Sequence, residues 1–275
     1  MNEYIINKEI ILFDYLKEIL PNKSKNNIKS LLKNECIYIN NKKVTKYNYL
    51  LKENDILYIK YKTSNLDIIY EDNNIIVIDK PSGLLTISNE KEKVKTLYHY
   101  VLEYLKKKKQ KVFIIHRLDK DTSGIVIFAK NEKIKKLYQD NWNDLVIKRG
   151  YIAVVCGKTK DNDTIKSYLK ENSNMMVYSS KDGKLAITHY EKLKSNNKYT
   201  MVQVYIDTGR KNQIRVHMKE NGTPIIGDKK YGCKDNTLKR LGLHSNILII
   251  KNPINNNILK FSSNYPKEFD ELLRR

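Results

Sequence analysis

The amino-acid sequence predicts an α+β protein with two folded units, a small one at the N-terminus and a larger one after it. A chain of 275 residues is long enough for one ordinary domain and a small additional one. Two helical patterns followed by short strand patterns predict the small unit. Strand patterns separated by turns predict an antiparallel meander in the larger unit.

The N-terminal unit begins with two predicted amphipathic helices. Apolar residues recur at helical spacing between Lys8 and Leu20, and Pro21 ends this pattern. Ser24 is the expected N-cap of the second helix. One side of the second helix carries three lysines at four-residue intervals, which are Lys25, Lys29 and Lys33. Such a row of like charges destabilises an isolated helix, so we expect these lysines to bind a chain of phosphates.

Short strands and one further helix follow these two helices. Residues rich in β-branched and aromatic side chains alternate here with Asn and Asp turn signals. The expected elements are a hairpin about Asn40-Asn41, a strand at Ile56–Tyr61, two strands within Ile68–Asp79 and a helix at Thr96–Lys106.

A dense group of charged and hydroxyl side chains lies between two strand patterns at residues 113–131. The loop from His116 to Gly124 holds a base, a guanidinium, two carboxylates and two hydroxyls. Rigid strands on both sides would hold the Asp119 carboxylate in place. Gly124 can adopt the positive φ that re-entry into a sheet requires. The pattern indicates either a reactive loop or a polar hairpin with a solvated aspartate.

The chain after this loop alternates between helix and strand patterns. Asn131 is the expected cap of a helix that ends near Trp142, and a strand broken at Gly150 follows. Asp182-Gly183 is a signal for a type I′ hairpin. The two strands expected to pair in the meander are Ala186–Lys192 and Tyr199–Ile206.

A second polar motif, residues 208–217, follows the meander at a predicted junction of strand and helix. Gly209 permits the turn, and Asn212 is the expected cap of the helix. Arg215 would then project from the first helical turn toward the strand end. Because a helix N-terminus attracts anions, an arginine there is best explained by a nearby carboxylate or phosphate.

The charge of the chain indicates a polyanionic partner. A formal net charge of +21 favours either a nucleic acid or an anionic membrane surface. Only seven of the 52 basic residues are arginines, and an arginine fork is not replaceable by lysine at bidentate sites. Four of the seven lie in or near the polar motifs, namely Arg117, Arg149, Arg210 and Arg215.

Cysteines and apolar runs exclude several classes of protein. Cys36, Cys156 and Cys233 show no spacing typical of a zinc site, and no structural disulfide is predicted from them. Acidic residues interrupt the apolar N-terminus, and no uncharged apolar run approaches the ~20 residues of a membrane span. We therefore expect a cytoplasmic protein that has no membrane association.

The string from His116 to Gly124, with Lys130-Asn131 after it, resembles the catalytic motif of the RluA-type pseudouridine synthases. Residues 149–157 are similar to a second line of that family, with Arg149 in place of its Lys. Residues 208–217 resemble its third motif, with Lys211-Asn212 in place of Thr-His. Similarity continues through Pro224–Asp228 to Pro253.

Residues 10–62 resemble the S4 RNA-binding module, although lysines stand where that module usually carries arginines. Together the resemblances imply an α+β fold in which a small S4-like (αL) domain precedes a synthase domain on a mixed, mainly antiparallel sheet flanked by helices. The predicted boundaries are 1–62 for the S4-like domain, 63–67 for a linker and 68–275 for the catalytic domain.

The resemblance implies conversion of uridine in RNA to pseudouridine without a metal or other cofactor. It assigns Asp119 as the catalytic carboxylate, Arg215 as its partner and Tyr151 as the ring that stacks on the flipped base. Arg117 would fill the space that the base vacates, and Arg210 would contact RNA with the three helix lysines. The expected partner is ribosomal RNA, with tRNA as the alternative, and a monomer is expected.

Two other classes of function compete with this interpretation. One is a non-catalytic RNA-binding protein, but a carboxylate that faces phosphates would weaken RNA binding unless it does chemistry. The other is a metal-dependent nuclease that uses Asp119 and Asp121. Residues two apart on an extended segment point to opposite faces, so these two would not readily share a metal. The sequence leaves open whether Asp119 attacks C1′ or removes the C2′ proton.

Overall fold

A computed structural model describes residues 2–21, 23–59, 66–90 and 92–274. Contacts within the chain divide it into two compact units. Unit 1 comprises Met1–Leu66 and Ile87–Lys109, and unit 2 comprises Asp67–Thr86 and Gln110–Arg275. Most of the predicted linker at 63–67 lies outside the described residues, so the predicted domain boundaries stay predictions.

Unit 1 packs two helices against a small antiparallel sheet with the strand order β1-β6-β3-β4. The core buries Leu12 and Leu16 of the first helix, Ile28 and Leu31 of the second, and Val94 from the segment before the third. The elements are β1 (Asn2–Ile5), β2 (Ile10–Ile11), α1 (Leu12–Ile19), α2 (Lys25–Lys33), β3 (Ile37–Ile39), β4 (Lys42–Lys43), β5 (Leu50–Leu51), β6 (Ile56–Ile59) and α3 (Leu97–Lys107).

Local sequence signals predict the N-cap of α2 and one hairpin of unit 1 correctly. The Ser24 side chain accepts a hydrogen bond from the backbone N–H of Asn27 at 3.3 Å, so the predicted N-cap of α2 is confirmed. Asn40 and Asn41 both have positive φ, of 47° and 66°, and join β3 to β4. Two such residues are what a type I′ turn requires, and the predicted hairpin is confirmed.

Unit 2 is built on one 11-stranded sheet whose main order is β13-β12-β14-β15-β11-β16-β10-β8-β7. Strand β17 pairs with β16, and β9 pairs with β10. Its strands are β7 (Asp67–Glu71), β8 (Ile75–Lys80), β9 (Phe113–Ile114), β10 (Ser123–Ala129), β11 (Val146–Cys156), β12 (Asn162–Glu171), β13 (Val177–Ser179), β14 (Lys184–Ser195), β15 (Tyr199–Ile206), β16 (Leu243–Lys251) and β17 (Ile258–Ser262).

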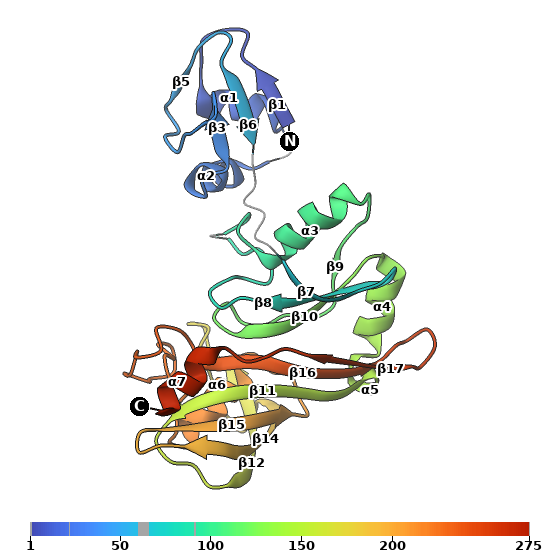
Figure 1. Cartoon of the computed structure of the whole chain (residues 1–275), viewed down its shortest axis with the longest axis vertical. Helices are drawn as coiled ribbons and strands as arrows, with labels where there is room; N and C mark the ends of the chain where they lie inside the picture. The colour runs from blue at the N-terminus through green and yellow to red at the C-terminus, as the bar shows by residue number, and fades with distance from the viewer. Residues whose placement is uncertain (1, 22, 60–65, 91, 275) are drawn as a thin grey trace. The chain divides into compact units, whose positions relative to one another are not determined.

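Four helices cover parts of this sheet and close separate apolar cores. Helix α4 packs on β10, α5 on β11, α6 on β13 and β14, and α7 on β15 (Figure 1). Asn131 caps α4 through its side chain, as predicted. No helix that the structure describes is long and apolar enough to cross a membrane. The four helices are α4 (Glu132–Asp140), α5 (Trp142–Leu145), α6 (Gln213–Glu220) and α7 (Lys267–Arg274).

The sheet changes direction at the joint between β10 and β16, which run parallel to each other. The other strand pairs among the described residues are antiparallel, so the predicted mixed, mainly antiparallel sheet is confirmed. Gly124 has φ of +110° at this joint, and a Cβ added there would lie 2.1 Å from the backbone oxygen of Ser245. Only glycine allows the two strands to approach this closely.

Two predictions about the strands of unit 2 are wrong. Neither Asp182 nor Gly183 has the positive φ of a type I′ turn, because β13 and β14 pair with β12 between them and not with each other. Strand β11 is continuous through Gly150, where the register against β16 shifts without breaking the strand. The irregularity that the glycine signalled is therefore a bulge.

Cys156 and Cys233 form a contact that their spacing in the sequence did not indicate. Both are free thiols, and their Sγ atoms lie 2.7 Å apart between the end of β11 and the loop before β16. Burial raises the pKa of the Cys156 thiol, and the neighbouring Cys233 adds to the effect.

Candidate active site

The loop that carries Asp119 is held by side chains from a second segment, residues 80–86, which follows β8. Three hydrogen bonds run from this segment to backbone carbonyls on either side of Asp119. They are Thr86 Oγ1 to Leu118 O at 2.7 Å, Lys80 Nζ to Lys120 O at 3.0 Å and Ser82 Oγ to Asp121 O at 2.6 Å. The Lys-Pro-Ser-Gly turn and Thr86 thus position the loop.

Lys80 is the central group of this support. Its side chain is fully buried, and Nζ also donates to the carbonyls of Pro81 at 3.0 Å and Leu84 at 2.8 Å. Burial lowers the pKa of Lys80 to about 7, although the negative charges of Asp121 and Asp119 act to raise it. Three carbonyl acceptors match the three donors of an ammonium group.

The pKa of Lys80 predicts a pH dependence of stability. Between pH 7 and the ordinary lysine value of 10.5, the unfolded chain holds a proton that the folded protein has released. Stability attributable to Lys80 should therefore rise with pH in this range. In urea unfolding, the free energy of unfolding of wild type minus that of Lys80→Met should increase by about 2 kcal/mol from pH 7 to pH 9. A constant difference over this range would contradict the lowered pKa.

His116 anchors the start of the same loop and is not free for proton transfer. Its Nε2 accepts a hydrogen bond from the backbone N–H of Ile127 at 3.1 Å, and its ring lies 5.0 Å from that of Trp142. Burial, and then the positive charge of Arg149, lower the pKa of His116 to about 4. The imidazole is therefore neutral at physiological pH and ties the loop to β10.

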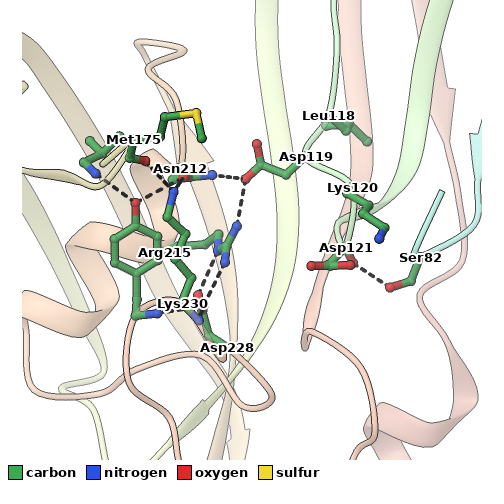
Figure 2. A network of polar contacts seen from close by, with 12 residues as sticks. Ser82, Leu118, Asp119, Lys120, Asp121, Met175, Asn212, Arg215, Asp228 and Lys230 are labelled. Atoms are coloured by element: carbon green, nitrogen blue, oxygen red, sulfur yellow. Dashed lines mark hydrogen bonds and ion pairs between the residues drawn. The ribbon is translucent and has the colours of Figure 1, made fainter. Parts of the chain in front are cut away.

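Asp119 is anchored through one of its two carboxylate oxygens. Oδ2 accepts hydrogen bonds from Arg215 NH1 at 3.3 Å and from Asn212 Nδ2 (Figure 2). Among the described residues, Oδ1 has no hydrogen-bond partner. The Asp119 side chain is 31% exposed, so it is held in place and still accessible. Asp121 lies apart from this contact, beside Ser82.

Arg215 reaches Asp119 from a stronger pair with Asp228. Its Nε and NH2 each donate to one carboxylate oxygen of Asp228 at 2.8 Å, which is a bidentate pair. Burial acts to lower the pKa of Arg215, but hydrogen bonds to Asp228 and the charges of Asp228 and Asp119 outweigh it and raise the pKa. The contact expected between Arg215 and Asp119 is present, whereas Asp228 received no role from the sequence.

Asn212 does not act as the side-chain cap that the sequence predicted for α6. It has left-handed backbone dihedrals, with φ of 53° and ψ of 19°, and makes no side-chain capping bond. Its amide bonds to Asp119 instead, while its Oδ1 accepts from Tyr231 OH at 3.1 Å and Lys230 Nζ at 3.2 Å. The long-range partners thus replace the local capping bond.

A pocket of about 330 Å³ opens in front of Asp119, and unit 2 alone supplies its walls. It brings together five of the residues predicted to form the site, which are Asp119, Tyr151, Arg215, Arg117 and Arg210. Burial raises the pKa of Tyr151, so its phenol stays protonated at neutral pH. Arg117 and Arg210 are exposed at the pocket, and Arg210 Nε donates to the carbonyl of Leu185 at 2.9 Å.

Arg149, one of the departures from the family motif, also lines this pocket. Its NH2 donates to the backbone carbonyl of Asp207. A Cβ added to Gly209 would lie 2.7 Å from Arg149 NH1, so the glycine makes room for the guanidinium. Arginine at 149 therefore joins β11 to the turn before α6.

The remaining predicted residues lie in unit 1. Lys25, Lys29 and Lys33 are exposed along α2, as their polar spacing indicated. Within the part of the chain that the structure describes, no group of three or more His, Cys, Asp or Glu side chains is arranged to hold a metal ion.

Two family models match the chain. The model described as RNA pseudouridylate synthase matches residues 74–220. The model described as S4 domain matches residues 12–57. The first covers more than half of the chain and includes Asp119, Tyr151, Asn212 and Arg215.

Individual relatives agree with these matches. The chain is 31% identical to the uncharacterized RNA pseudouridine synthase YhcT of Bacillus subtilis, over 96% of this chain and 92% of that protein. It is 38% identical to the ribosomal large subunit pseudouridine synthase D of Borreliella burgdorferi, over 74% of this chain and 66% of that protein.

A solved structure supports the fold. Human RNA pseudouridylate synthase domain containing 4 superposes with a TM-score of 0.62 at 23% identity, covering 75% of this chain and 91% of that structure. The α+β arrangement predicted for the catalytic part is thereby confirmed.

Proposed function

The chain belongs to the RNA pseudouridylate synthase family, and from that premise we propose that Asp119 is the carboxylate that acts on the sugar of the target uridine. The enzyme cuts the bond between uracil N1 and C1′, turns the base and joins C5 to C1′; C5 then loses its proton and N1 gains one, so the reaction is a net isomerisation. The observation that carries the assignment is that Asp119 lies at the pocket with Oδ2 held by two donors and Oδ1 without a described partner. Such an oxygen is available to attack C1′ or to remove the C2′ proton.

Electrostatic support comes from Arg215. Its guanidinium, held by the bidentate pair with Asp228, donates to Oδ2 of Asp119 at 3.3 Å and so places a positive charge beside the carboxylate. Because the Arg215 side chain is only 9% exposed, it has little surface for an RNA phosphate. We therefore assign Arg215 to the carboxylate rather than to RNA binding.

Other pocket residues suit the handling of a flipped base. A uracil must leave the RNA stack before its glycosidic bond is accessible. The Tyr151 ring on the pocket wall would stack on the extruded base, and exposed Arg117 would occupy the vacated space. Exposed Arg210 would bind the RNA backbone at the pocket edge.

Ribosomal RNA is the favoured substrate, since the similar protein of Borreliella burgdorferi is named for the large ribosomal subunit. A tRNA target is the alternative. The two relatives named above are synthases, which favours the synthase over both the non-catalytic binding protein and the nuclease. The monomeric state and the cytoplasmic location stay predictions.

Mapping pseudouridines in total RNA from cells with and without this gene tests the function. We expect one or a few pseudouridines in large-subunit ribosomal RNA to disappear, and the purified enzyme to restore them on transcripts of that region. Loss confined to tRNA would move the substrate to tRNA. An unchanged map together with an inactive purified enzyme would contradict the proposal.

The lysine row on α2 is proposed to bind the RNA backbone. Replacing Lys25, Lys29 and Lys33 together by Ala should weaken RNA binding, because three phosphate contacts are lost. Each lost contact lowers the magnitude of the slope of log K against log salt by roughly 0.7–0.9. The magnitude of the slope should therefore fall by about 2, while the rate at saturating RNA stays unchanged. Binding titrations at several salt concentrations and single-turnover rates measure both quantities.

A charge-matched variant separates this site from a general effect of charge. Lys133, Lys251 and Lys267 are exposed in unit 2 and do not line the pocket. Their triple replacement by Ala should change the slope much less. Equal slopes for the two triple variants would show that the α2 lysines are only solvated. The substitutions are preferable to deleting 1–62, because Val94 packs in the core of unit 1.

A further inference from the structure

We propose that Asn212 is a positioning residue that fixes the orientation of the Asp119 carboxylate toward the substrate. This role rests on the proposed catalytic function of Asp119, since it acts through that carboxylate. Asn212 occupies a position where this chain departs from the motif it resembles, so the role is not carried over from that motif.

The direction of the Asn212 amide is set by its surroundings. Tyr231 OH accepts a hydrogen bond from the Val177 backbone N–H at 3.2 Å and so directs its own proton to Asn212 Oδ1. The Lys230 ammonium donates to the same oxygen at 3.2 Å and to the Met175 carbonyl at 2.6 Å. With two donors on its oxygen, the amide must present its nitrogen to Asp119 (Figure 2).

The backbone at Asn212 accommodates this orientation at low cost. Its φ of 53° lies in the left-handed region, where Asn, Asp and His are enriched among residues other than glycine. The residue is 8% exposed, and its side chain makes no capping bond to α6. The buried amide is therefore committed to the contact with Asp119.

Two donors on one oxygen fix the rotation of the carboxylate. Asn212 Nδ2 and Arg215 NH1 both bind Oδ2, so turning the carboxylate out of this orientation would break both bonds. The other oxygen, which has no hydrogen-bond partner among the described residues, is thereby left available to the substrate. The Lys230 ammonium on Asn212 Oδ1 also polarises the amide and strengthens its N–H as a donor.

The test must account for every charged group near this amide. Burial, and then the positive charges of Lys211 and Arg215, lower the pKa of Lys230. The titratable and charged groups around Asn212 are Asp119, Arg215, Asp228, Lys230, Tyr231 and the ion pair of Lys211 with Glu171.

Asn212→Asp is the decisive substitution, because it keeps the shape and the left-handed preference but removes the donor. The introduced carboxylate would face Asp119, so the single-turnover rate at saturating RNA should fall about 100-fold at pH 7.5. When protonated, the introduced group can donate to Oδ2 as the amide does. The ratio of variant to wild-type rate should therefore rise as the pH falls from 7.5 to 5.5.

A purely structural defect would behave differently. It would lower the rate of Asn212→Asp by the same factor at every pH. Either that outcome or a rate within threefold of wild type at pH 7.5 would overturn the role of Asn212. Asn212→His retains an N–H donor and should stay within about tenfold of wild type. If Asn212→His were more than about tenfold slower than wild type and still had a normal thermal unfolding curve, the role of Asn212 would also be overturned.

Asn256→Asp is the matched control. Asn256 is exposed in unit 2 and has a similar φ of 58°, outside the pocket. Its rate should equal that of wild type at every pH, which shows that an Asn to Asp change at a left-handed position is harmless by itself. If Asp119→Asn were active, the proposed function of Asp119 itself would be wrong. Failure of that function can therefore be distinguished from failure of the positioning role of Asn212.

Discussion

Asp119→Asn should abolish pseudouridine formation, lowering the single-turnover rate by more than roughly a thousandfold. The substitution preserves shape but removes the charge and presents an amide to the two donors that now bind Oδ2. RNA affinity should change little or increase, because a negative charge that faces phosphates is lost. Rates at saturating RNA and a binding titration on one uridine-containing substrate measure the two effects.

Asp121→Asn is the control for this experiment. It removes the same charge two residues away, from an exposed side chain whose own backbone carbonyl is bound by Ser82. Its rate should stay within a few fold of wild type. If Asp119→Asn retained a tenth of the wild-type rate, or if Asp121→Asn were the inactive variant, the assignment of the catalytic carboxylate would be wrong.

Arg215→Lys should lower the rate about 100-fold while the salt dependence of RNA binding stays the same. Lysine keeps the charge, but its single Nζ cannot stand at the positions of Nε, NH2 and NH1 at once, so it cannot pair with both carboxylates as the guanidinium fork does. Arg215→Leu is less informative, because it would leave the buried Asp228 carboxylate unpaired, at a cost of about 3–5 kcal/mol. The conservative change therefore tests the pairing without unfolding the protein.

Arg210→Leu should give the opposite pattern. Arg210 is exposed at the pocket and is proposed to bind a phosphate. Its loss should therefore lower the magnitude of the slope of log K against log salt by roughly 0.7–0.9, the value for one phosphate contact. Its rate at saturating RNA should change little. Should Arg215→Lys instead show a shallower slope and a normal rate, Arg215 would be an RNA contact and not the partner of Asp119.

Local signals in the sequence were sufficient for elements whose stabilising contacts are local. Ser24 and Asn131 cap their helices within three residues, and Asn40-Asn41 closes its hairpin directly. The hairpin signal at Asp182-Gly183 failed because the partner of both flanking strands is β12, which comes earlier in the chain. A turn signal cannot report such a partner.

The site was predictable to the extent that its residues lie in compact motifs. Asp119 stood out between two strands, and Arg215 at a strand-to-helix junction. Asn212 followed a capping rule in the sequence, yet it binds Asp119 from 93 positions away. Asp228 and Lys80 act through buried contacts that only the folded chain creates. The only signal for Asp228 was its place in the matched Gly-Asp string.

The three hydrogen bonds from residues 80–86 to the loop around Asp119 have a consequence for turnover. They form when the protein folds, so the loop does not require the RNA to give it its shape. The conformational entropy of ordering the Asp119 carboxylate is therefore lost once per folding event and not in each catalytic cycle. Binding energy from the RNA is left for unstacking the target base, which is the costly step on the substrate side.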